Sequence, residues 1–314
     1  MKFLDEQAVR ELLRMEALIP VMEDALRALS SAEAVQPLRN VLSVPGHGGF
    51  FFTMPASVSG QLGAKLVTFY PDNKDVHTHH ALIMLFRPET GEPLAVMDGR
   101  LITEMRTAAV SAAATRRLAR KDARSLAIIG SGVQAQSHLE AMRLVRQFEE
   151  VSVWSPTRAE AFAREHGVRA ATSAEDAVRG ADVVVVATTS RTPVLQGSWL
   201  SPGVHVNAVG APRPDWRELD DEALGRCRLY VEAREAASRE SGDVIAAGHI
   251  FAEIGEVIGG QRPGRQHEDD ITLFKSVGVA VEDIAAAGLV YRASGDAGLK
   301  PAWPADSGTA HRSS

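Results

Sequence analysis

Residues 125–140 read Ser125-Leu-Ala-Ile-Ile-Gly130-Ser-Gly132-Val-Gln-Ala135-Gln-Ser-His-Leu-Glu140, an aliphatic run that turns through glycines into a helical pattern. This order predicts a strand, a phosphate-binding loop and a helix. Gly130 allows the tight turn, Gly132 lets the backbone approach a pyrophosphate, and Ala135 lets the helix pack on the strand. The helix N-terminus then presents unpaired N–H groups to an anion. We therefore predict a dinucleotide-binding unit.

The residues after the next predicted strand bear on which dinucleotide is bound. That strand, Glu149-Glu-Val-Ser-Val-Trp154, is followed by Ser155-Pro-Thr157-Arg158. An NAD site usually has an acidic residue here for the ribose 2′-hydroxyl, whereas an arginine accommodates a 2′-phosphate. The acid is missing, and two hydroxyls with a guanidinium suit a phosphate. We predict NADPH rather than NADH; the alternative is that Thr157 caps a helix and Arg158 is only solvated.

Composition and charge exclude several classes of function. The 314 residues suggest two domains, and 45% hydrophobic with 24% charged residues is typical of a globular protein. A net charge of −6 without a basic stripe argues against nucleic-acid binding. The single cysteine, Cys227, permits no intramolecular disulfide and fits a reducing compartment. Because we find no secretory signal and no run long enough to span a bilayer, we expect a cytoplasmic protein without membrane association.

The part of the chain before the phosphate-binding loop combines helices with a sheet. Apolar residues at helical spacing in 5–13 and 19–29 predict two short helices. Five β-rich runs separated by Pro, Gly, Asp and Asn predict a mostly antiparallel sheet: 40–44, 50–54, 64–70, 81–86 and 94–97. An alanine-rich helix over 103–119 leads into the nucleotide-binding unit.

Strands and helices alternate after the loop, which predicts a parallel sheet covered on both faces. The strand candidates are 181–187, 205–209 and 228–232, and helices begin near Arg158, Ser173 and Glu218. A last long helix over 279–291 could return to the first domain, since chain termini often lie close together. The tail from Gly295, rich in Pro, Ser, Gly and Ala, is expected to be loosely held.

Charged residues in apolar surroundings are the first candidates for chemistry beside a nicotinamide. Lys65 lies in Leu62-Gly-Ala-Lys-Leu-Val-Thr-Phe, where a buried ammonium is costly unless it meets an anion; it could equally reach solvent from a sheet edge. Arg106, near a predicted helix start, could hold a carboxylate or a cofactor phosphate, although an arginine on an alanine-rich helix is more often solvated. Arg39, after Gln36-Pro-Leu, is a weaker candidate.

Two other kinds of site find little support. The run His77-Thr-His79-His80 has no accompanying cluster of His, Cys or Asp to complete a metal site, so we predict no metal. A hydrogen-bonding role near the cofactor is favoured for these histidines. No Gly-x-Ser-x-Gly elbow or Cys/His pair supports a covalent hydrolase mechanism.

Further motifs resemble those of the ornithine cyclodeaminase/mu-crystallin family, and they cover nearly the whole chain. The matching runs are 36–39, 65–70, 95–99, 106–112, 130–138, 207–221, 240–243, 251–257 and 274–283. The run Arg213-Pro-Asp-Trp-Arg-Glu-Leu-Asp-Asp221 looks like the mu-crystallin branch, whose members are NADPH-dependent ketimine reductases. At the segment that corresponds to Gly210, cyclodeaminases have a motif similar to Gly-Gly-Asp-x-Pro-Gly-Lys. The aspartate of that motif engages the substrate amine. This chain has Pro212 at that position, which favours reduction of a preformed imine.

The expected fold class is α/β, with a Rossmann-type doubly wound parallel sheet plus an α+β substrate-binding and dimerisation domain. We place the substrate-binding domain at 1–115, joined by the C-terminal segment 277–314, and the NADP-binding domain at 116–276. The resemblance implies a homodimer built through the substrate-binding domain.

The resemblance also implies site residues. Arg39, Lys65 and Arg106 are expected to face the substrate carboxylate and the nicotinamide, with Glu240 near the substrate. Cofactor contacts are expected at Thr78, His79, Arg106, Thr107, Gly130, Gly132, Val133, Gln134, Ser155, Thr157, Arg158, Thr188 and Ser276.

These observations predict an NADPH-dependent reductase of a C=N bond next to a carboxylate, acting on a small imino or amino acid. Arg39, Lys65 and Arg106 would hold the carboxylate, and Lys65 or Glu240 would donate the proton or stabilise the iminium. The alternatives are an amino-acid dehydrogenase or reductive aminase, an ornithine-cyclodeaminase-like enzyme, and an NADPH-dependent binding protein for a thyroid-hormone-like acid. Aromatic residues could line the pocket of such a binding protein, namely Phe50, Phe51, Phe52, Phe69 and Trp216.

Overall fold

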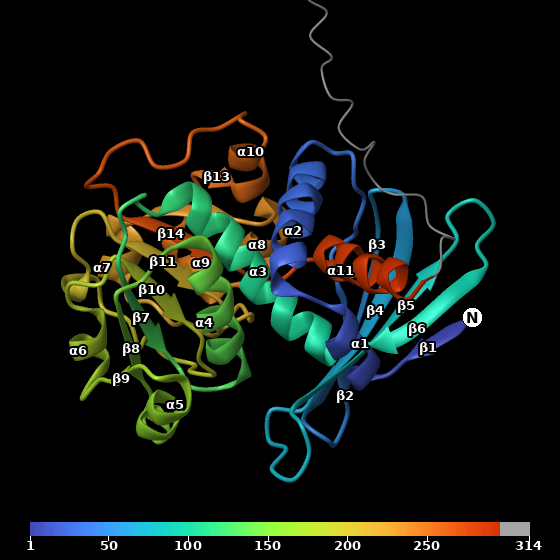
Figure 1. Cartoon of the computed structure of the whole chain (residues 1–314), viewed down its shortest axis with the longest axis horizontal. Helices are drawn as coiled ribbons and strands as arrows, with labels where there is room; N and C mark the ends of the chain where they lie inside the picture. Colours follow the sequence, from blue (N-terminus) through green and yellow to red (C-terminus); the bar gives the residue numbers. More distant parts are fainter. Residues whose placement is uncertain (296–314) are drawn as a thin grey trace, which may run out of the picture.

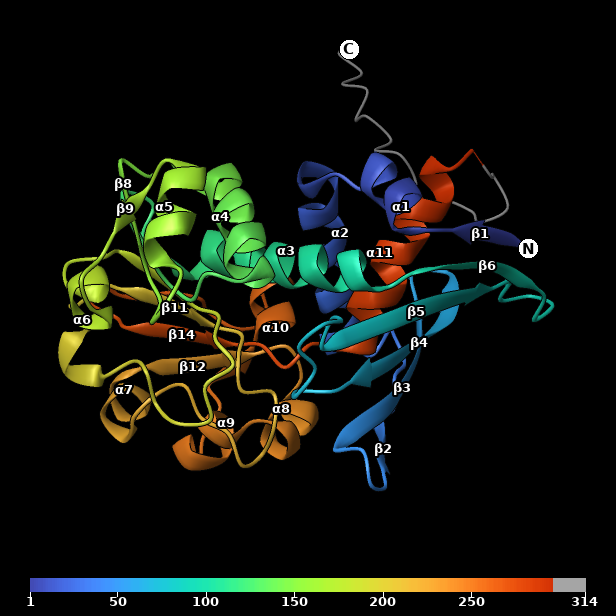
Figure 2. The same cartoon turned by 90° about the horizontal axis from the view of Figure 1, so that it is seen from below.

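The computed structural model describes residues 1–295, which form two β-sheets set side by side. Figure 1 shows the six-stranded sheet of the N-terminal third beside an eight-stranded sheet, with helices α2 (Met15–Ser30) and α3 (Arg100–Leu118) between them. Helix α3 runs from one half into the other (Figure 2). Within the described range, none of the helices combines the length and apolarity needed to cross a membrane.

The six-stranded sheet is mostly antiparallel, as predicted. Its strand order is β1 (Lys2–Leu4), β6 (Pro93–Asp98), β5 (His79–Phe86), β4 (Gln61–Phe69), β3 (Gly49–Val58) and β2 (Asn40–Val44). The pairs from β2 to β6 are antiparallel, whereas β1 pairs in parallel with β6. Strand β1 was missed because three residues are too few to show an alternating pattern.

The two N-terminal helices are α1 (Glu6–Leu12) and α2, and the prediction of a short second helix was wrong. Helix α2 starts four residues before the predicted range and contains Pro20 in its first turns. A proline inside a helix costs about 3 kcal/mol. Here Pro20 is exposed, while Met15, Leu18 and Met22 are buried, so packing of the apolar face outweighs the local cost.

Helix α11 (Ala280–Ala293) covers one face of the six-stranded sheet. It packs on β3, β4 and β5 and also contacts α2 and α3, so the last described helix does return to the N-terminal part of the chain. A side chain at Gly63 in β4 would come within 2.8 Å of Ile284, which shows how closely helix and sheet approach. The exact domain boundaries stay a prediction, and the tail after Gly295 lies outside the described residues.

The eight-stranded sheet is parallel throughout, which confirms the Rossmann-type prediction. Its order is β13 (Ala252–Glu253), β12 (Arg228–Val231), β14 (Thr272–Lys275), β11 (His205–Ala208), β10 (Val183–Val186), β7 (Ser125–Ile129), β8 (Glu150–Trp154) and β9 (Arg169–Ala170). Helices α4 (Val133–Val145) and α5 (Ala159–His166) lie on one face (Figure 2). Helices α7 (Asp221–Arg226), α8 (Arg234–Glu240) and α9 (Gly242–Ala247) lie on the other. The short elements α6 (Ala174–Val178), η1 (Gly197–Trp199) and α10 (Ile254–Ile258) complete the fold.

The strand order determines where a ligand can bind. The chain reverses direction across the sheet at β7, which lies between β8 and β10, and open parallel sheets bind ligands outside the carboxyl ends of their strands at such a point. The last strand, β14, is inserted between β11 and β12. The segment that connects it to α11 therefore leaves from the same carboxyl edge and links the cofactor half to the N-terminal sheet.

Candidate active site

The loop after β7 has the geometry of a phosphate-binding turn. Gly130 has a φ of +121°, and a Cβ atom there would lie 2.2 Å from the carbonyl oxygen of Ala187. A Cβ atom on Gly132 would have no protein atom within 4 Å, so this backbone faces open space. Helix α4 begins at Val133, and no side chain caps its N-terminus. The N–H groups of its first turn can therefore receive a pyrophosphate, and the loop fits a dinucleotide.

The end of β8 carries the residues predicted to select the dinucleotide. Ser131 Oγ donates a hydrogen bond to Ser155 Oγ at 2.8 Å, which joins the phosphate loop to this segment. Ser155 Oγ in turn accepts a hydrogen bond from the backbone N–H of Arg158 at 3.1 Å. The N-cap of α5 is Arg158 rather than Thr157, so the alternative of Thr157 as the helix cap was wrong. The side chains of Thr157 and Arg158 are exposed on this edge.

The other predicted cofactor residues come from both halves of the protein. Thr188 follows β10 and Ser276 follows β14, both at the carboxyl edge. Thr107 lies on α3 next to Arg106, and Thr78 and His79 lie at the start of β5. Gln134, in the first turn of α4, has a buried Oε1 without a hydrogen-bond partner among the described residues. Contact of these residues with a cofactor stays a prediction.

Lys65 and Arg106 meet a pair of acids at the start of α11. Lys65 Nζ lies 2.6 Å from Asp283 Oδ2, and Arg106 Nε donates to Asp283 Oδ1 at 3.0 Å. Arg106 Nη1 also donates to Glu282 Oε2 at 2.8 Å. All four side chains are buried. The alternatives of a Lys65 that reaches solvent and a solvated Arg106 were therefore wrong.

Arg39 and Glu240 extend this cluster toward the loop after β14. Arg39 Nη2 donates to the carbonyl oxygens of Val277 and Gly278 and lies 2.7 Å from Glu240 Oε2. The backbone N–H groups of Val277 and Gly278 donate to the buried carboxylate of Glu232, which follows β12. The structure thus brings together all four residues predicted as catalytic: Arg39, Lys65, Arg106 and Glu240. Their chemical roles stay predictions.

Gly278 lets the loop pass close to Arg106. Its φ is +74°, and a Cβ atom there would lie 2.6 Å from Arg106 Nη1 and Nη2. A larger residue would therefore displace the guanidinium group. Glu282, in the first turn of the helix that follows this loop, accepts a hydrogen bond from the same guanidinium group.

Burial and charge shift several pKa values in this cluster. Burial lowers the pKa of Lys65 to about 8, although Asp283 opposes the shift. Desolvation by the surrounding protein, with the charges of Lys65 and Arg106, lowers the pKa of His79 to about 4, although part of its surface stays exposed. Burial raises the pKa of Glu282 to about 8, against the influence of Arg106. Burial acts to raise the pKa of Asp283 too, but the neighbouring cations Arg106 and Lys65 outweigh it and hold this pKa below its usual range.

The acids of this cluster were missed by reasoning from sequence. Glu282, Asp283 and Glu232 received no role, yet they determine where the cations point. One signal was present: Glu282 and Asp283 stand side by side in a helix that is otherwise almost entirely apolar. Charged side chains on a helix that is apolar all round must be buried and paired.

A second buried cluster of charged residues contacts the segments that leave the carboxyl edge of the parallel sheet. Lys275 Nζ lies 3.0 Å from Asp243 Oδ2 and donates to the carbonyl oxygen of Gly210. Glu218 Oε1 accepts from the backbone N–H of Thr188 at 2.9 Å and from its hydroxyl at 2.7 Å. Burial raises the pKa of Glu218 to about 7, against the influence of Lys275. These contacts fix the segments after β10 and β11, where Thr188 is expected to meet the cofactor.

The histidines and aromatic residues singled out above lie in several places. His77 and His80 pack ring against ring at 6.0 Å, whereas His79 packs on Phe69 at 5.4 Å. Among residues 1–295, no group of three or more His, Cys, Asp and Glu side chains could hold a metal ion. Trp216, from the segment after β11, packs edge-on against Phe69 with ring centroids 6.5 Å apart.

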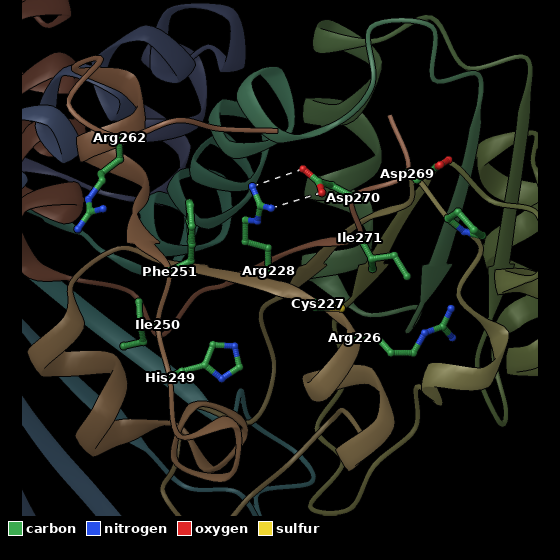
Figure 3. A pocket seen from close by; sticks show the side chains of 11 residues that line it. Arg226, Cys227, Arg228, His249, Ile250, Phe251, Arg262, Asp269, Asp270 and Ile271 are labelled. Atoms are coloured by element: carbon green, nitrogen blue, oxygen red, sulfur yellow. Dashed lines mark hydrogen bonds and ion pairs between the residues drawn. The ribbon is translucent and has the colours of Figure 1, made fainter. Parts of the chain in front are cut away.

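An open cavity of about 780 Å³ lies elsewhere, at the amino ends of β12 and β14 (Figure 3). Its wall includes Arg226, Cys227, Arg228 and Asp270. Figure 3 shows that the guanidinium of Arg228 points toward Asp270, with which it forms an ion pair at 3.4 Å. Because parallel sheets bind ligands at the opposite edge, this cavity does not belong to the candidate active site.

The chain matches known proteins along almost its entire length. The model of the ornithine cyclodeaminase/mu-crystallin family matches residues 1–297. The chain belongs to this family. Ketimine reductase mu-crystallin of Mus musculus is 48% identical over 302 residues, which cover 92% of this chain and 96% of the relative. The resemblance read from the sequence motifs is therefore confirmed.

Solved structures of the family share the fold. The structure of Thermococcus litoralis Δ1-pyrroline-2-carboxylate reductase in complex with NADH and L-proline superposes with a TM-score of 0.90 at 39% identity, covering 95% of this chain and 99% of that one. An archaeal alanine dehydrogenase dimer with bound NAD superposes with a TM-score of 0.89 at 35% identity, covering 94% and 96%. In this chain the charged cluster and the phosphate-binding loop lie at the same carboxyl edge of the parallel sheet.

Proposed function

We propose that this protein reduces C=N bonds next to a carboxylate with a nicotinamide dinucleotide as the electron donor, and that its substrates are small cyclic imino acids. The observation that carries the proposal is the meeting of Arg39, Lys65 and Arg106 at the carboxyl edge that also holds the phosphate loop. The relatives named ketimine reductase and Δ1-pyrroline-2-carboxylate reductase support the same reaction class.

In this proposal the cations hold the substrate carboxylate. NADPH, when bound, supplies the hydride. Lys65, whose pKa of about 8 leaves it charged at neutral pH, and Arg106 are held by Asp283 and have little freedom to reorient. Such fixed charges orient a carboxylate with little further loss of side-chain entropy, so most of the catalysis comes from positioning. Glu240, paired with Arg39, is the residue that would stabilise positive charge on the substrate nitrogen.

We propose NADPH as the preferred cofactor. The supporting residues are Ser155, Thr157 and Arg158 at the end of β8, where no acidic side chain is available for a ribose 2′-hydroxyl. The two solved relatives contain NADH and NAD, so this preference would be a property of the β8 edge of this chain rather than of the fold.

We further propose a homodimer formed through the face of the six-stranded sheet that α11 does not cover. Side-chain alternation places Leu66 and Leu82 opposite each other on that face, beside Ala64 and Met84. Leu82 is 51% exposed, although it lies in the middle of an apolar strand. An extended apolar sheet face of this kind is typical of a subunit interface. The substrate-binding and dimerisation part would then be 1–115 with 277–314, and the cofactor-binding part 116–276.

The proposal is tested by following NADPH and NADH oxidation with 1-pyrroline-2-carboxylate and with its six-membered homologue. We expect turnover with NADPH, and a loss of about tenfold to a hundredfold in kcat/KM for Arg39→Ala, the range for one charge-assisted contact. Arg239→Ala is the matched control, because Arg239 lies on the same helix as Glu240 but is exposed. Absence of imine reduction together with amination of a 2-oxo acid by ammonia would instead favour the amino-acid dehydrogenase alternative.

A further inference from the structure

Glu282 forms hydrogen bonds through one of its two carboxylate oxygens only. Its Oε2 accepts hydrogen bonds from Arg106 Nη1 at 2.8 Å and from the backbone N–H of Val279 at 3.3 Å. Its Oε1 is buried and has no hydrogen-bond partner within the described part of the chain. A buried anionic oxygen without a donor is costly, whereas the protonated carboxyl group carries no charge to desolvate.

Two other buried carboxylate oxygens of the cluster, Asp283 Oδ2 and Glu240 Oε2, also lack a well-aligned hydrogen bond within the described residues, but each lies close to a cation, at 2.6 Å and 2.7 Å. Asp283 contacts Lys65 with one oxygen and Arg106 with the other. Both oxygens of Glu232 accept backbone N–H groups of the loop after β14. Glu240 is half-buried and pairs with Arg39. Glu282 is therefore the member of the cluster at which a proton relieves most unfavourable charge.

The cluster holds four carboxyl groups against three cations before any substrate enters: Glu232, Glu240, Glu282 and Asp283 against Arg39, Lys65 and Arg106. The charged groups that influence Glu282 come from three elements, namely Arg106 of α3, Glu232 after β12 and Asp283 of α11. A substrate carboxylate brings one more negative charge to the same cations. Charge balance in a buried site then favours uptake of a proton.

We propose that Glu282 takes up a proton from water when an anionic substrate binds, so that substrate binding is linked to protonation of this carboxyl group. The inference rests on the proposed function, because it requires the carboxylate of the substrate to lie among Arg39, Lys65 and Arg106. The step forms one O–H bond at the Glu282 carboxylate and breaks the bond that held the proton to the acid form of the buffer in bulk solvent, with no oxidation or reduction. Glu282 acts through Arg106 and is in this sense a positioning residue.

The linkage makes the affinity for an anionic substrate fall as pH rises. Burial, with Glu232 and Asp283 nearby, already raises the pKa of Glu282 to about 8, and a bound carboxylate would raise it further. At neutral pH most molecules therefore carry the proton before binding. Above about pH 8 they must acquire it during binding, and the affinity weakens accordingly.

The test is calorimetric binding of pyrrole-2-carboxylate to the protein saturated with NADP⁺, in buffers that differ in their enthalpy of ionisation. This probe is a planar ring carboxylate whose nitrogen is not basic, so any proton taken up goes to the protein. We expect uptake of more than about half a proton per site near pH 8.5 and close to none near pH 6.5. Burial also lowers the pKa of Lys65 to about 8, so the variants are compared in a Lys65→Arg background, whose cation does not titrate in this range. In that background Glu282→Gln should bind the probe without uptake, and Glu240→Gln should keep the uptake.

Infrared difference spectra of the same complexes give a second readout. Binding near pH 8.5 should produce the C=O stretching band of a protonated carboxyl group, and that band should be missing in Glu282→Gln. In the Lys65→Arg background, binding of the probe without proton uptake, or uptake that persists when Glu282→Gln is added, overturns the inference while leaving the reductase proposal intact. Failure of the probe to bind together with failure to reduce any cyclic imine overturns both.

Discussion

Lys65 Nζ lies 2.6 Å from Asp283 Oδ2, and this contact ties the middle of β4 to the first turn of α11. Asp283 simultaneously accepts from Arg106 of α3, so one buried carboxylate connects three elements that are distant in the sequence. The same carboxylate therefore holds the fold together and aims the two cations that we assign to the substrate.

Removing one partner of this contact should damage both stability and activity. Lys65→Met leaves Asp283 buried with one cation fewer, and breaking such a pair costs about 3–5 kcal/mol. Urea unfolding measures the loss, and imine reduction measures activity. The double variant Lys65→Met/Asp283→Asn removes both charges and should recover part of the stability without any activity. Recovery of activity in the double variant would show that Lys65 does not bind substrate.

The two loop glycines should respond differently to alanine. Gly130→Ala has no room for its Cβ atom, which would lie 2.2 Å from the carbonyl oxygen of Ala187, so the melting temperature should fall. Gly132→Ala meets no protein atom and has an ordinary extended backbone, so it should fold like the wild type yet bind NADPH poorly. Thermal unfolding and fluorescence titration separate the two effects. Unchanged NADPH affinity in Gly132→Ala would argue against a pyrophosphate at this loop.

Arg158 should decide between the two dinucleotides. Arg158→Ala removes the guanidinium at the end of β8 and should lower kcat/KM for NADPH by about tenfold to a hundredfold, the value of one charge-assisted contact. The value for NADH should stay nearly unchanged. Arg164→Ala, on the same helix and also exposed, is the control. An equal loss of kcat/KM with NADPH and with NADH would show that Arg158 does not bind the 2′-phosphate.

Glu218 should give the stability a specific pH dependence. Burial raises its pKa from 4.5 to about 7 in the folded protein, so the native state binds this proton more tightly than the unfolded chain does. The resulting stabilisation is complete below about pH 4.5 and is lost as the pH rises through about 7. Glu218→Gln should flatten the melting temperature over this window, whereas the exposed Glu222→Gln should not. Parallel profiles for wild type and Glu218→Gln would contradict the assignment.

The proposed dimer interface can be probed with one charge. Leu82→Lys places an ammonium in the uncovered sheet face and should convert the dimer to a monomer at micromolar concentration. Light scattering coupled to size-exclusion chromatography measures the mass. Ile245→Lys, at a residue that is 49% exposed on α9, is the matched control and should leave the mass unchanged. A Leu82→Lys protein that remains dimeric would place the interface elsewhere.

Local sequence patterns were sufficient to predict much of the fold. The glycine spacing after an aliphatic run predicted the β7–loop–α4 unit, and the alternation of strands and helices predicted the parallel sheet. Short elements such as β1 and β9 were missed because two or three residues carry no periodicity. The length of α2 was underestimated because tertiary packing of its apolar face overrides the local effect of Pro20.

Local motifs were enough to identify the class of the protein: a dinucleotide loop, family motifs that run along the chain, and cations in apolar surroundings at Lys65 and Arg106. Those motifs could not show which acids the cations meet, because Asp283 and Glu282 lie far along the chain and reach the cluster only when α11 packs on β4. The pairing of these acids with the cations follows from the packing of the folded chain. Burial penalises an unpaired charge, so the position and protonation of each group depend on the neighbours that folding brings to it.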